Sequence, residues 1–463
     1  MIREFEWHIN KVFHYCKDND TWAFSYVDDE TGAILTTTPK VAYTIYASVM
    51  FLMAYWMTGN STYLDWAEKT INFIHAGLHP SGLLHGKFNM TSNEFYGDHI
   101  VGSQVAWLRL LLYAYELTKN TTYLSWAHDA FDAFYRYSLN RTVWRMYRLV
   151  NLTDLTPLPQ VGYGHGQYQY VYGHYWSALA WFYELTENET IARVACNMAL
   201  GYWDVRNKTT NLALHLVDYS ETGEKTVPWY SRGGAGGSGH IAMTISGLVD
   251  LYEATGNATI LQIIRDYTLA FDRYYWRPEL NRYRYGCRAD GSVVYDHLET
   301  HGYEGFGSGL LRAALLLQNE TLLSHVLAVK ALAERLWEEH DRYDEWRTYA
   351  TNNTVRSWSH VRTPYSSQLW WYDFWERKNT TDVDVLLKMH EWWAENRKSP
   401  YGYLDGKPSD PKVFSTLNLY FFMPYNIWFR HLTERMRGPF LIPLVGEASI
   451  LSSDPLGFWY RDV

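Results

Sequence analysis

One tripeptide, Asn-x-Thr, recurs six times at nearly constant spacing along this chain of 463 residues. Successive asparagines stand 60, 68, 69, 62 and 60 residues apart, at Asn60, Asn120, Asn188, Asn257, Asn319 and Asn379. A period this regular is typical of a repeat protein, in which each repeat is one supersecondary unit. The repeat therefore constrains the fold more strongly than any other feature of the sequence.

Each repeat has two kinds of helical segment, one on each side of its asparagine. The segment before it, as at 101–118 and 241–255, is apolar nearly all round, which predicts a helix buried on most sides. The segment after it, as at 63–76 and 123–137, places charged residues between apolar residues at helical spacing, which predicts an amphipathic helix. Asn or Thr at the junction can cap the second helix. Each repeat is therefore predicted to be a helical hairpin with a tight turn.

The connections between successive hairpins are long, at residues 77–100, 138–170, 207–239, 277–303 and 341–365. Connections of this length are uncommon in a compact domain and are usually functional. Strict alternation puts the short turns on one rim and the long loops on the other. Six such hairpins curled into a ring make an all-α (α/α)6 toroid. Two further predicted helices, at 2–16 and 413–435, either close a seventh hairpin or clasp the six.

Composition narrows the class of protein. No linker-like break interrupts the period, so residues 1–463 are predicted to form a single toroid domain, with 1–42 and 400–463 as flanking segments. The net charge of −9, without a basic stripe, argues against a nucleic-acid partner. No apolar run is long and clean enough to span a membrane. Three cysteines cannot build a disulfide framework and show no zinc spacing, and we expect no cofactor.

Five more Asn-x-Thr tripeptides lie outside the regular turns, at Asn89, Asn140, Asn151, Asn207 and Asn352. All eleven copies have Thr at the third position, which suggests selection for N-glycosylation in a secreted or cell-surface protein. The alternative is that Asn-x-Thr is only a good helix-start signal. The five irregular copies favour glycosylation, because capping is not expected to explain them all. No secretory signal precedes Met1, so a processed or trimmed chain is expected.

Aromatic residues make up 17% of the chain, and many fall in the long connections, among them Tyr168, Tyr170, Tyr285 and Tyr295. Flat apolar faces with polar tips suit sugar rings, although the loops of a large ring also need aromatic residues for packing. We expect a mouth that binds carbohydrate. Its aromatic candidates are Trp176, Trp229, Tyr303 and Trp358.

Carboxylates supply candidates for glycosidic cleavage, which needs two of them on opposite sides of the bond. Asp98, just before the second buried helix, is the first candidate, and its structural alternative is a helix N-cap. Three more candidates, Asp296, Glu299 and Glu304, stand together before the fifth buried helix. A ring can bring Asp98 across from this acidic segment.

Histidines stand at the start of four buried helices, at His99, His174, His240 and His301. A single one is more often structural, but together they could hold an anionic sugar, act as bases or bind a metal. No close pair such as H-x-x-x-H supports a metal. Arg232 precedes a glycine-rich stretch, in which the backbone can approach a ligand closely.

From residue 40 to 400 the chain resembles the six-hairpin glycosidase superfamily. The local likeness is to unsaturated uronyl hydrolases. The segment Tyr96-Gly-Asp98-His-Ile is similar to their catalytic Asp motif, and Trp229-Tyr-Ser-Arg232-Gly-Gly is similar to their Arg-Gly motif. Here the two motifs stand two repeats apart rather than about one. The resemblance implies carbohydrate chemistry, with Asp98 in the acid/base place.

Three functions remain open from the sequence. The first is a secreted glycoside hydrolase acting on an oligo- or polysaccharide, with Asp98 and either Glu304 or Asp296 as the carboxyl pair. The second is a uronate polysaccharide lyase or sugar epimerase, in which Tyr172, His174, His240 and Arg232 would act. The third is a non-catalytic glycan-binding or surface-layer component.

Overall fold

The computed structural model describes residues 2–28, 30–158, 167–217, 234–298, 305–343, 345–359, 367–396, 398–400, 402–407 and 410–413. The chain divides into two compact units. The first comprises Met1–Gly97, Ala106–Asp129 and His360–Val463, and the second comprises Asp98–Val105 and Ala130–Ser359. The single-domain organisation inferred from the unbroken repeat stays a prediction.

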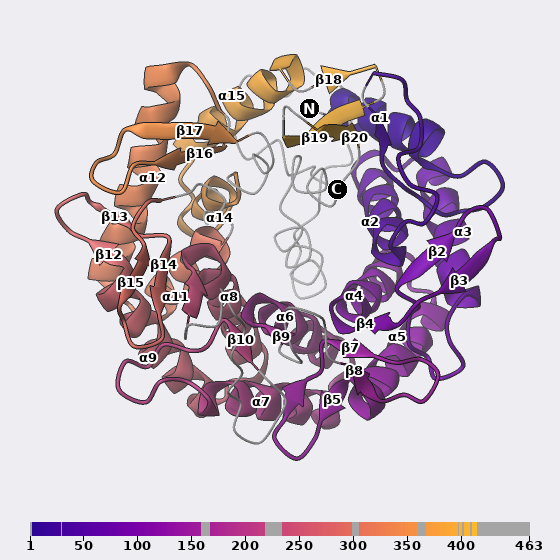
Figure 1. Ribbon diagram of the computed structural model, residues 1–463, viewed down its shortest axis with the longest axis horizontal. Coiled ribbons are helices and arrows are strands. Elements are labelled where there is room, and N and C mark those ends of the chain that lie inside the picture. Colours follow the sequence, from indigo (N-terminus) through magenta and orange to yellow (C-terminus); the bar gives the residue numbers. More distant parts are fainter. Residues whose placement is uncertain are drawn as a thin grey trace, which may run out of the picture. The chain divides into compact units, whose positions relative to one another are not determined.

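Six consecutive helix pairs follow the Asn-x-Thr period in the described part of the chain, which confirms the predicted hairpins (Figure 1). The pairs are α2 (Val41–Thr58) with α3 (Ser61–Ala76), α4 (Val101–Thr118) with α5 (Thr121–Ala133), α6 (Gln169–Thr186) with α7 (Glu189–Asp204), α8 (Ser238–Thr255) with α9 (Ala258–Tyr275), α11 (Arg312–Leu316) with α12 (Glu320–His340), and α14 (Gln368–Arg377) with α15 (Thr381–Asn396). Short π-helices end α5, at η2 (Phe134–Ser138), and precede α11, at η4 (Phe306–Leu311). The first helix of a pair is buried on most sides and the second on one side, as α2 and α3 show.

The turn inside each of the first four hairpins follows from the repeated sequence Thr-x-Asn-x-Thr, whereas Leu317 and Arg377 replace the first Thr in the last two. Between α2 and α3, the Thr58 hydroxyl donates to the Ala54 carbonyl at 2.7 Å and accepts the Asn60 N–H at 3.2 Å. The Asn60 side-chain oxygen then accepts the N–H of Thr62 at 3.0 Å, so the predicted helix cap is confirmed. The residue before the asparagine is left-handed in all six turns: Gly59, Lys119, Glu187, Gly256, Gln318 and Lys378.

The five irregular Asn-x-Thr copies use the same local hydrogen bond. Each asparagine side-chain oxygen accepts the N–H of the threonine two residues on, at 2.7 to 3.0 Å, in Asn89, Asn140, Asn151, Asn207 and Asn352. This is an Asx turn, which Asn forms readily outside helices. These asparagines do not cap helices, as expected, but the Asx turn gives each of them a structural role that does not require a glycan.

The predicted first flanking helix is confirmed as α1 (Ile2–Lys11), continued by the π-helix η1 (Val12–Cys16). Tyr63 on α3 donates its hydroxyl to Glu6 at 3.3 Å, just as Tyr123 on α5 donates to Glu68 on α3 at 3.4 Å. Helix α1 thus contacts α3 in the way that α3 contacts α5, and it belongs with the second helices of the pairs.

The predicted last flanking helix begins differently. Val413 ends strand β20 (Asp410–Val413), which pairs with β19 (Gly402–Lys407) and β1 (Val27–Asp28). The rest of that predicted helix, 414–435, lies outside the described residues.

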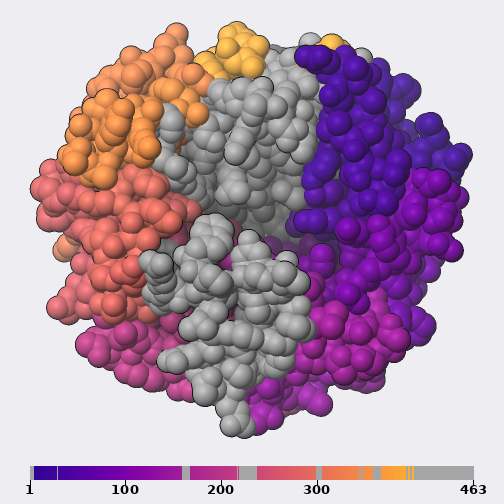
Figure 2. All heavy atoms as spheres, in the orientation of Figure 1, coloured from indigo at the N-terminus to yellow at the C-terminus, as the bar shows by residue number. Residues whose placement is uncertain are grey.

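The long connections carry short antiparallel strands. In the first unit β2 (Lys87–Asn89) pairs with β3 (Glu94–Tyr96), and β18 (Lys398–Ser399) pairs with β19. In the second unit β4 (His99–Ile100), β7 (Leu149–Val150) and β8 (Pro157–Leu158) form one sheet, and β11 (Gly234–Gly237), β14 (Gly286–Arg288) and β15 (Val293–Tyr295) form another. The remaining pairs there are β5 (Leu139–Asn140) with β6 (Arg145–Met146), β9 (Gln167–Tyr168) with β10 (Leu216–Val217), β12 (Trp276–Arg277) with β13 (Arg282–Tyr283), and β16 (Glu345–Thr348) with β17 (Val355–Ser359). Figure 2 shows at the surface the salmon to orange part of the chain, which includes β12 to β17 together with α11 and α12.

In the second unit, glycines let the first helices of three successive pairs pack closely against one another. A Cβ atom on Gly247 of α8 would lie 2.1 Å from the Gly173 carbonyl oxygen of α6, and one on Gly309 of η4 would lie 1.9 Å from the Ala242 carbonyl oxygen of α8. These positions leave no room for a side chain, so glycine sets the spacing of the helices. The close approach brings the first turns of α6 and α8 together.

One described helix, α2, is long and apolar enough to cross a membrane, contrary to the expectation from the sequence, but 72% of it is buried within the protein, as in a core helix. The three cysteines, Cys16, Cys196 and Cys287, are free.

Candidate active site

A cluster of aromatic and imidazole rings, which we call the histidine cluster, lies where α6 and α8 begin. It consists of Tyr170 and His174 on α6, His240 on α8, Tyr168 on β9, and His215 just before β10. Tyr170 stacks on His240 at a centroid distance of 4.9 Å and meets His174 edge-on at 5.9 Å. His215 stacks on His240 at 5.2 Å, with 13° between the ring planes. Tyr168 contacts both Tyr170, at 5.4 Å, and His215, at 5.3 Å. Two predicted site residues, His174 and His240, are thus brought together around one tyrosine.

The cluster is only partly open to solvent. His174, His240, Tyr168 and Tyr170 are half-buried, whereas His215 is buried. Burial, and to a smaller extent the positive charge of Arg148, lowers the pKa of His215 to about 4. His215 is therefore neutral at physiological pH.

A buried hydrogen-bond network lies against His215. The Gln169 side-chain amide contacts His215 Nδ1 at 3.1 Å, and its oxygen accepts the hydroxyls of Tyr202 at 3.2 Å and Tyr267 at 2.9 Å. The Gln169 N–H also donates to the His215 carbonyl at 2.9 Å. The β9–β10 pairing that precedes α6 holds these residues in register.

Arg148 connects this cluster to the segment that carries Asp98. Its guanidinium lies 4.4 Å from the centre of the Tyr168 ring, and its backbone carbonyl accepts the N–H of Val101 at 3.1 Å. Strand β4 then pairs His99 with Val150. The start of α4 and the histidine cluster therefore share one residue as a support.

Asp98 itself is exposed and makes no hydrogen bond or ion pair with any described residue. Strand β4 stands between it and the first residue of α4, Val101, so it does not take the helix-cap position weighed against its catalytic role. Its neighbour His99 is fully buried.

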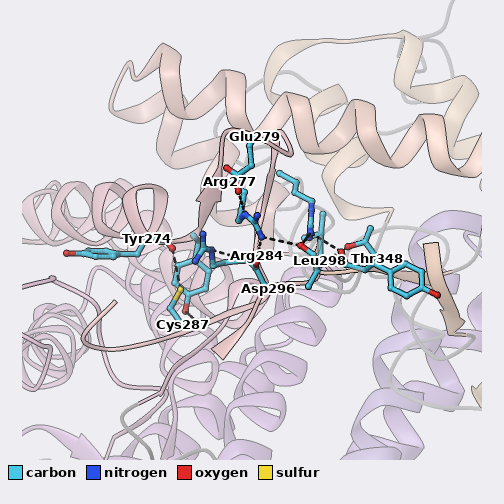
Figure 3. A network of polar contacts seen from close by, with 12 residues as sticks. Tyr274, Arg277, Glu279, Arg284, Cys287, Asp296, Leu298 and Thr348 are labelled. Carbon is cyan, nitrogen blue, oxygen red and sulfur yellow. Dashed lines mark hydrogen bonds and ion pairs between the residues drawn. The ribbon is translucent and has the colours of Figure 1, made fainter. Parts of the chain in front are cut away.

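Asp296 follows β15 and is held between two arginines (Figure 3). Arg277 pairs with it through Nη1 and with Glu279 through Nε, and the Arg284 Nε lies 3.6 Å from its second oxygen. Arg277 also donates to the Ala350 carbonyl at 3.2 Å, which ties this loop to the β16–β17 hairpin. Asp296 thus lies in an ion-pair network that links its loop to β12 and β13, which favours a structural role.

Three other candidates lie in packed surroundings. Trp176 and Tyr172 on α6 are fully buried, and the Tyr172 hydroxyl accepts the Met146 N–H at 2.9 Å. Trp358 on β17 is half-buried between His340, at 5.3 Å, and Arg342, at 4.9 Å. Neither Trp176 nor Tyr172 has exposed surface through which a substrate could reach it.

The described part of the glycine-rich stretch forms strand β11 against β14. A Cβ on Gly237 would lie 3.1 Å from the Tyr285 ring. At this glycine the backbone therefore approaches a side chain of the protein, where the sequence suggested a ligand. Ser238, the first residue of α8, donates its N–H to the Tyr285 carbonyl at 2.7 Å, which fixes the start of the helix that carries His240. The remaining candidates lie outside the described residues: Trp229, Arg232, Glu299, His301, Tyr303 and Glu304.

The described residues contain no group of three or more His, Cys, Asp or Glu side chains placed to hold a metal ion. The sequence analysis missed His215, Gln169 and Arg148. His215 stands well inside a long connection rather than at a helix start, so the pattern that identified the other histidines passed over it. The signal that could have found it is the apolar pair Leu216–Val217, which follows it and forms strand β10.

No protein-family model and no curated protein sequence match this chain. Solved structures do match it. A D-mannose isomerase is 16% identical, with 79% of this chain and 95% of that chain covered and a TM-score of 0.56. Cellobiose 2-epimerase from Bacillus thermoamylovorans is also 16% identical, with 81% and 99% covered and a TM-score of 0.60. A sugar epimerase from a ruminal bacterium is 13% identical, with the same coverage and a TM-score of 0.59.

These likenesses establish the fold class. The chain is an all-α protein with the (α/α)6 toroid fold, as predicted. The expected resemblance to the six-hairpin superfamily is confirmed at the level of the fold.

Proposed function

We propose that this protein is a carbohydrate-active enzyme that removes and returns a proton beside a sugar carbonyl, the chemistry of an epimerase or isomerase. The observation that carries this proposal is the position of Tyr170, whose ring contacts both His174 and His240 at the adjacent starts of α6 and α8. Imidazole titrates near neutral pH and can act as base in one protonation state and as acid in the other.

The reaction needs two proton-transfer groups and no external oxidant. In the open-chain form of an aldose, a neutral imidazole takes the proton from C2, and the electron pair moves into an enediolate with the carbonyl carbon. A protonated imidazole on the other side returns a proton to the opposite face of C2, which inverts that centre. Return of the proton to C1 instead, with transfer of the O2 hydroxyl proton to O1, gives the ketose. His174 and His240 are the two groups that we assign, with Tyr170 between them. The solved structures with the same fold include a D-mannose isomerase and sugar epimerases, which supports this choice.

The test is product analysis with D-mannose, D-glucose and cellobiose. The wild-type protein is expected to convert at least one of them to its C2 epimer or to the ketose. His240→Asn and His174→Asn should each lower the rate by about 100-fold or more, as is typical for loss of a general acid or base. His325→Asn is the matched control, because His325 pairs with Asp272 at 2.8 Å, away from the histidine cluster. Full activity in both cluster variants would rule out this assignment.

A glycoside hydrolase is the second candidate, and one observation favours it. Asp98 is exposed and unpaired among the described residues, so its carboxylate is available to a substrate. Asp98→Asn should then abolish release of reducing sugar from an oligosaccharide while leaving the far-ultraviolet circular dichroism unchanged. The lyase alternative predicts an unsaturated product that absorbs in the near ultraviolet.

We also propose that the protein acts outside the cell as a glycoprotein, on the basis of its eleven Asn-x-Thr tripeptides. A glycan on Nδ2 leaves the side-chain oxygen free to keep its turn. In two copies Nδ2 is already used: Asn257 donates to Cys196 Sγ at 3.6 Å, and Asn379 donates to Asp373 at 3.1 Å and to Asp382 at 3.2 Å. Peptide mass spectrometry of protein secreted from a glycosylating host should find glycans at the exposed Asn60, Asn120 and Asn352, and none at Asn257 or Asn379. Absence of glycan at all eleven positions would contradict this proposal.

A further inference from the structure

We infer that His215 is a positioning residue of the histidine cluster, fixed by Gln169 as the neutral tautomer with its proton on Nε2, so that of the stacked pair His215 and His240 only His240 gains and loses a proton. The tautomer is a property of the fold, whereas the role toward His240 rests on the proposed function.

The Gln169 side chain determines which nitrogen of His215 carries the proton. Its oxygen accepts two hydroxyl hydrogen bonds, from Tyr202 on α7 and Tyr267 on α9. The amide nitrogen therefore faces His215 Nδ1 at 3.1 Å, and an amide nitrogen can only donate. Nδ1 must then be the acceptor, and in a neutral imidazole the proton lies on Nε2.

The groups around His215 oppose a second proton. His215 is buried, and its ring centroid lies 5.2 Å from that of His240 and 5.3 Å from that of Tyr168. The positively charged guanidinium of Arg148 lies over the Tyr168 ring. Gln169 adds a donor to Nδ1, so protonation there would break that hydrogen bond. Tyr202 and Tyr267 are buried, and burial raises the pKa of both phenols, so they stay neutral as well.

A neutral His215 has two consequences for His240. Its ring face fixes the plane of the His240 imidazole by stacking. Its lack of charge leaves His240 free to accept a proton, because a cation at this distance would oppose one. Gln169 contacts His215, and it thereby acts on His240 through His215.

Nitrogen NMR of protein labelled with ¹⁵N-histidine tests the tautomer directly, with His215→Gln used for assignment. His215 should show an unprotonated Nδ1 and a protonated Nε2, unchanged between pH 5.5 and 8. A protonated Nδ1, or a titration midpoint above pH 6, would overturn the inference, since the first result means that the Gln169 amide is turned the other way.

Gln169→Glu provides the sharper contrast. A carboxylate in place of the amide accepts a proton from Nδ1, so the tautomer should switch and the His215 titration should move up by at least one pH unit. Gln169→Leu, which has no polar atom, is the matched control: it removes the donor to Nδ1 without adding a charge, so it should raise the titration by clearly less than Gln169→Glu does.

The role toward His240 has its own readout. In Gln169→Glu the acid limb of the kcat/KM profile should move to lower pH, because a charged His215 opposes protonation of His240. An unchanged profile alongside a shifted His215 titration would overturn the positioning role. If the wild type shows the expected tautomer but converts no sugar, the proposed reaction fails and the tautomer stands.

Discussion

The imidazole of His215 lies nearly parallel to that of His240, at 13° and a centroid distance of 5.2 Å. Two features of the fold produce this contact. Glycine contacts bring α6 and α8 together, and the pairing of β9 with β10 places His215 beside the start of α6. A buried imidazole therefore supports a half-buried one at the place where two helices begin.

Acidification should destabilise the protein through its buried histidines. Burial lowers the pKa of His215 to about 4 and that of His8 to about 3, both below the ordinary value of 6.5. Between those values and 6.5 the unfolded chain binds more protons than the folded one. The contribution of these histidines to the free energy of unfolding is therefore complete above pH 6.5 and is lost as pH falls toward 4. For His215 alone the loss is about 3 kcal/mol.

Urea unfolding at pH 7 and pH 4.5 measures this effect. The difference in unfolding free energy between the two pH values should be smaller in His215→Gln than in the wild type. Equal differences would show that His215 does not titrate as its burial requires.

The left-handed residue in each hairpin turn should respond to glycine in a predictable way. Glu187 has φ 52° without the freedom of glycine, so Glu187→Gly should stabilise the protein by about 1 kcal/mol, and Glu187→Ala should not. Gly256→Ala should destabilise by a similar amount, since a Cβ there meets nothing within 4 Å and only the backbone strain acts. Thermal unfolding of the three variants measures these effects. Equal melting temperatures for Glu187→Ala and Glu187→Gly would contradict backbone strain as their cause.

The asparagine caps should contribute measurable stability. Asn188 accepts the Thr190 N–H at 3.0 Å, so Asn188→Ala should cost about 1 kcal/mol. Asn188→Asp keeps the acceptor and should cost little, although it removes the glycan acceptor. Chemical denaturation of unglycosylated protein compares the two, and an equal loss in both would mean that the oxygen is not what matters.

Glycine at the contact between α6 and α8 should tolerate no side chain. Gly247→Ala would place a methyl group 2.1 Å from the Gly173 carbonyl oxygen, so we expect a loss of several kcal/mol or failure to fold. Gly102→Ala in α4 is the matched control, because its nearest atoms lie 3.9 Å away on Val171. That substitution should be neutral or stabilising, as Ala is the better helix former. Similar melting temperatures for the two variants would contradict the helix spacing described above.

Local features of this protein could be predicted from its sequence, and contacts across loops could not. The turns and caps of the first four hairpins follow from Thr-x-Asn-x-Thr, in which every hydrogen-bond partner stands within four residues of the next. His174 and His240 were found because they stand at helix starts. His215 was not, because its position depends on which strand β10 pairs with. Asp296 looked catalytic because acidic residues crowd around it, and only the structure shows that Arg277 and Arg284 hold it.

Solvent deuterium exchange tests the central proposal most directly. The protein would be incubated in D₂O with each of D-mannose, D-glucose and cellobiose, and the C2 proton followed by NMR. We predict exchange at C2 of at least one sugar with the wild type and with His325→Asn, and a loss of about 100-fold or more with His240→Asn. Exchange that persists in His240→Asn, or sugar cleavage by the wild type without any exchange at C2, would contradict the account.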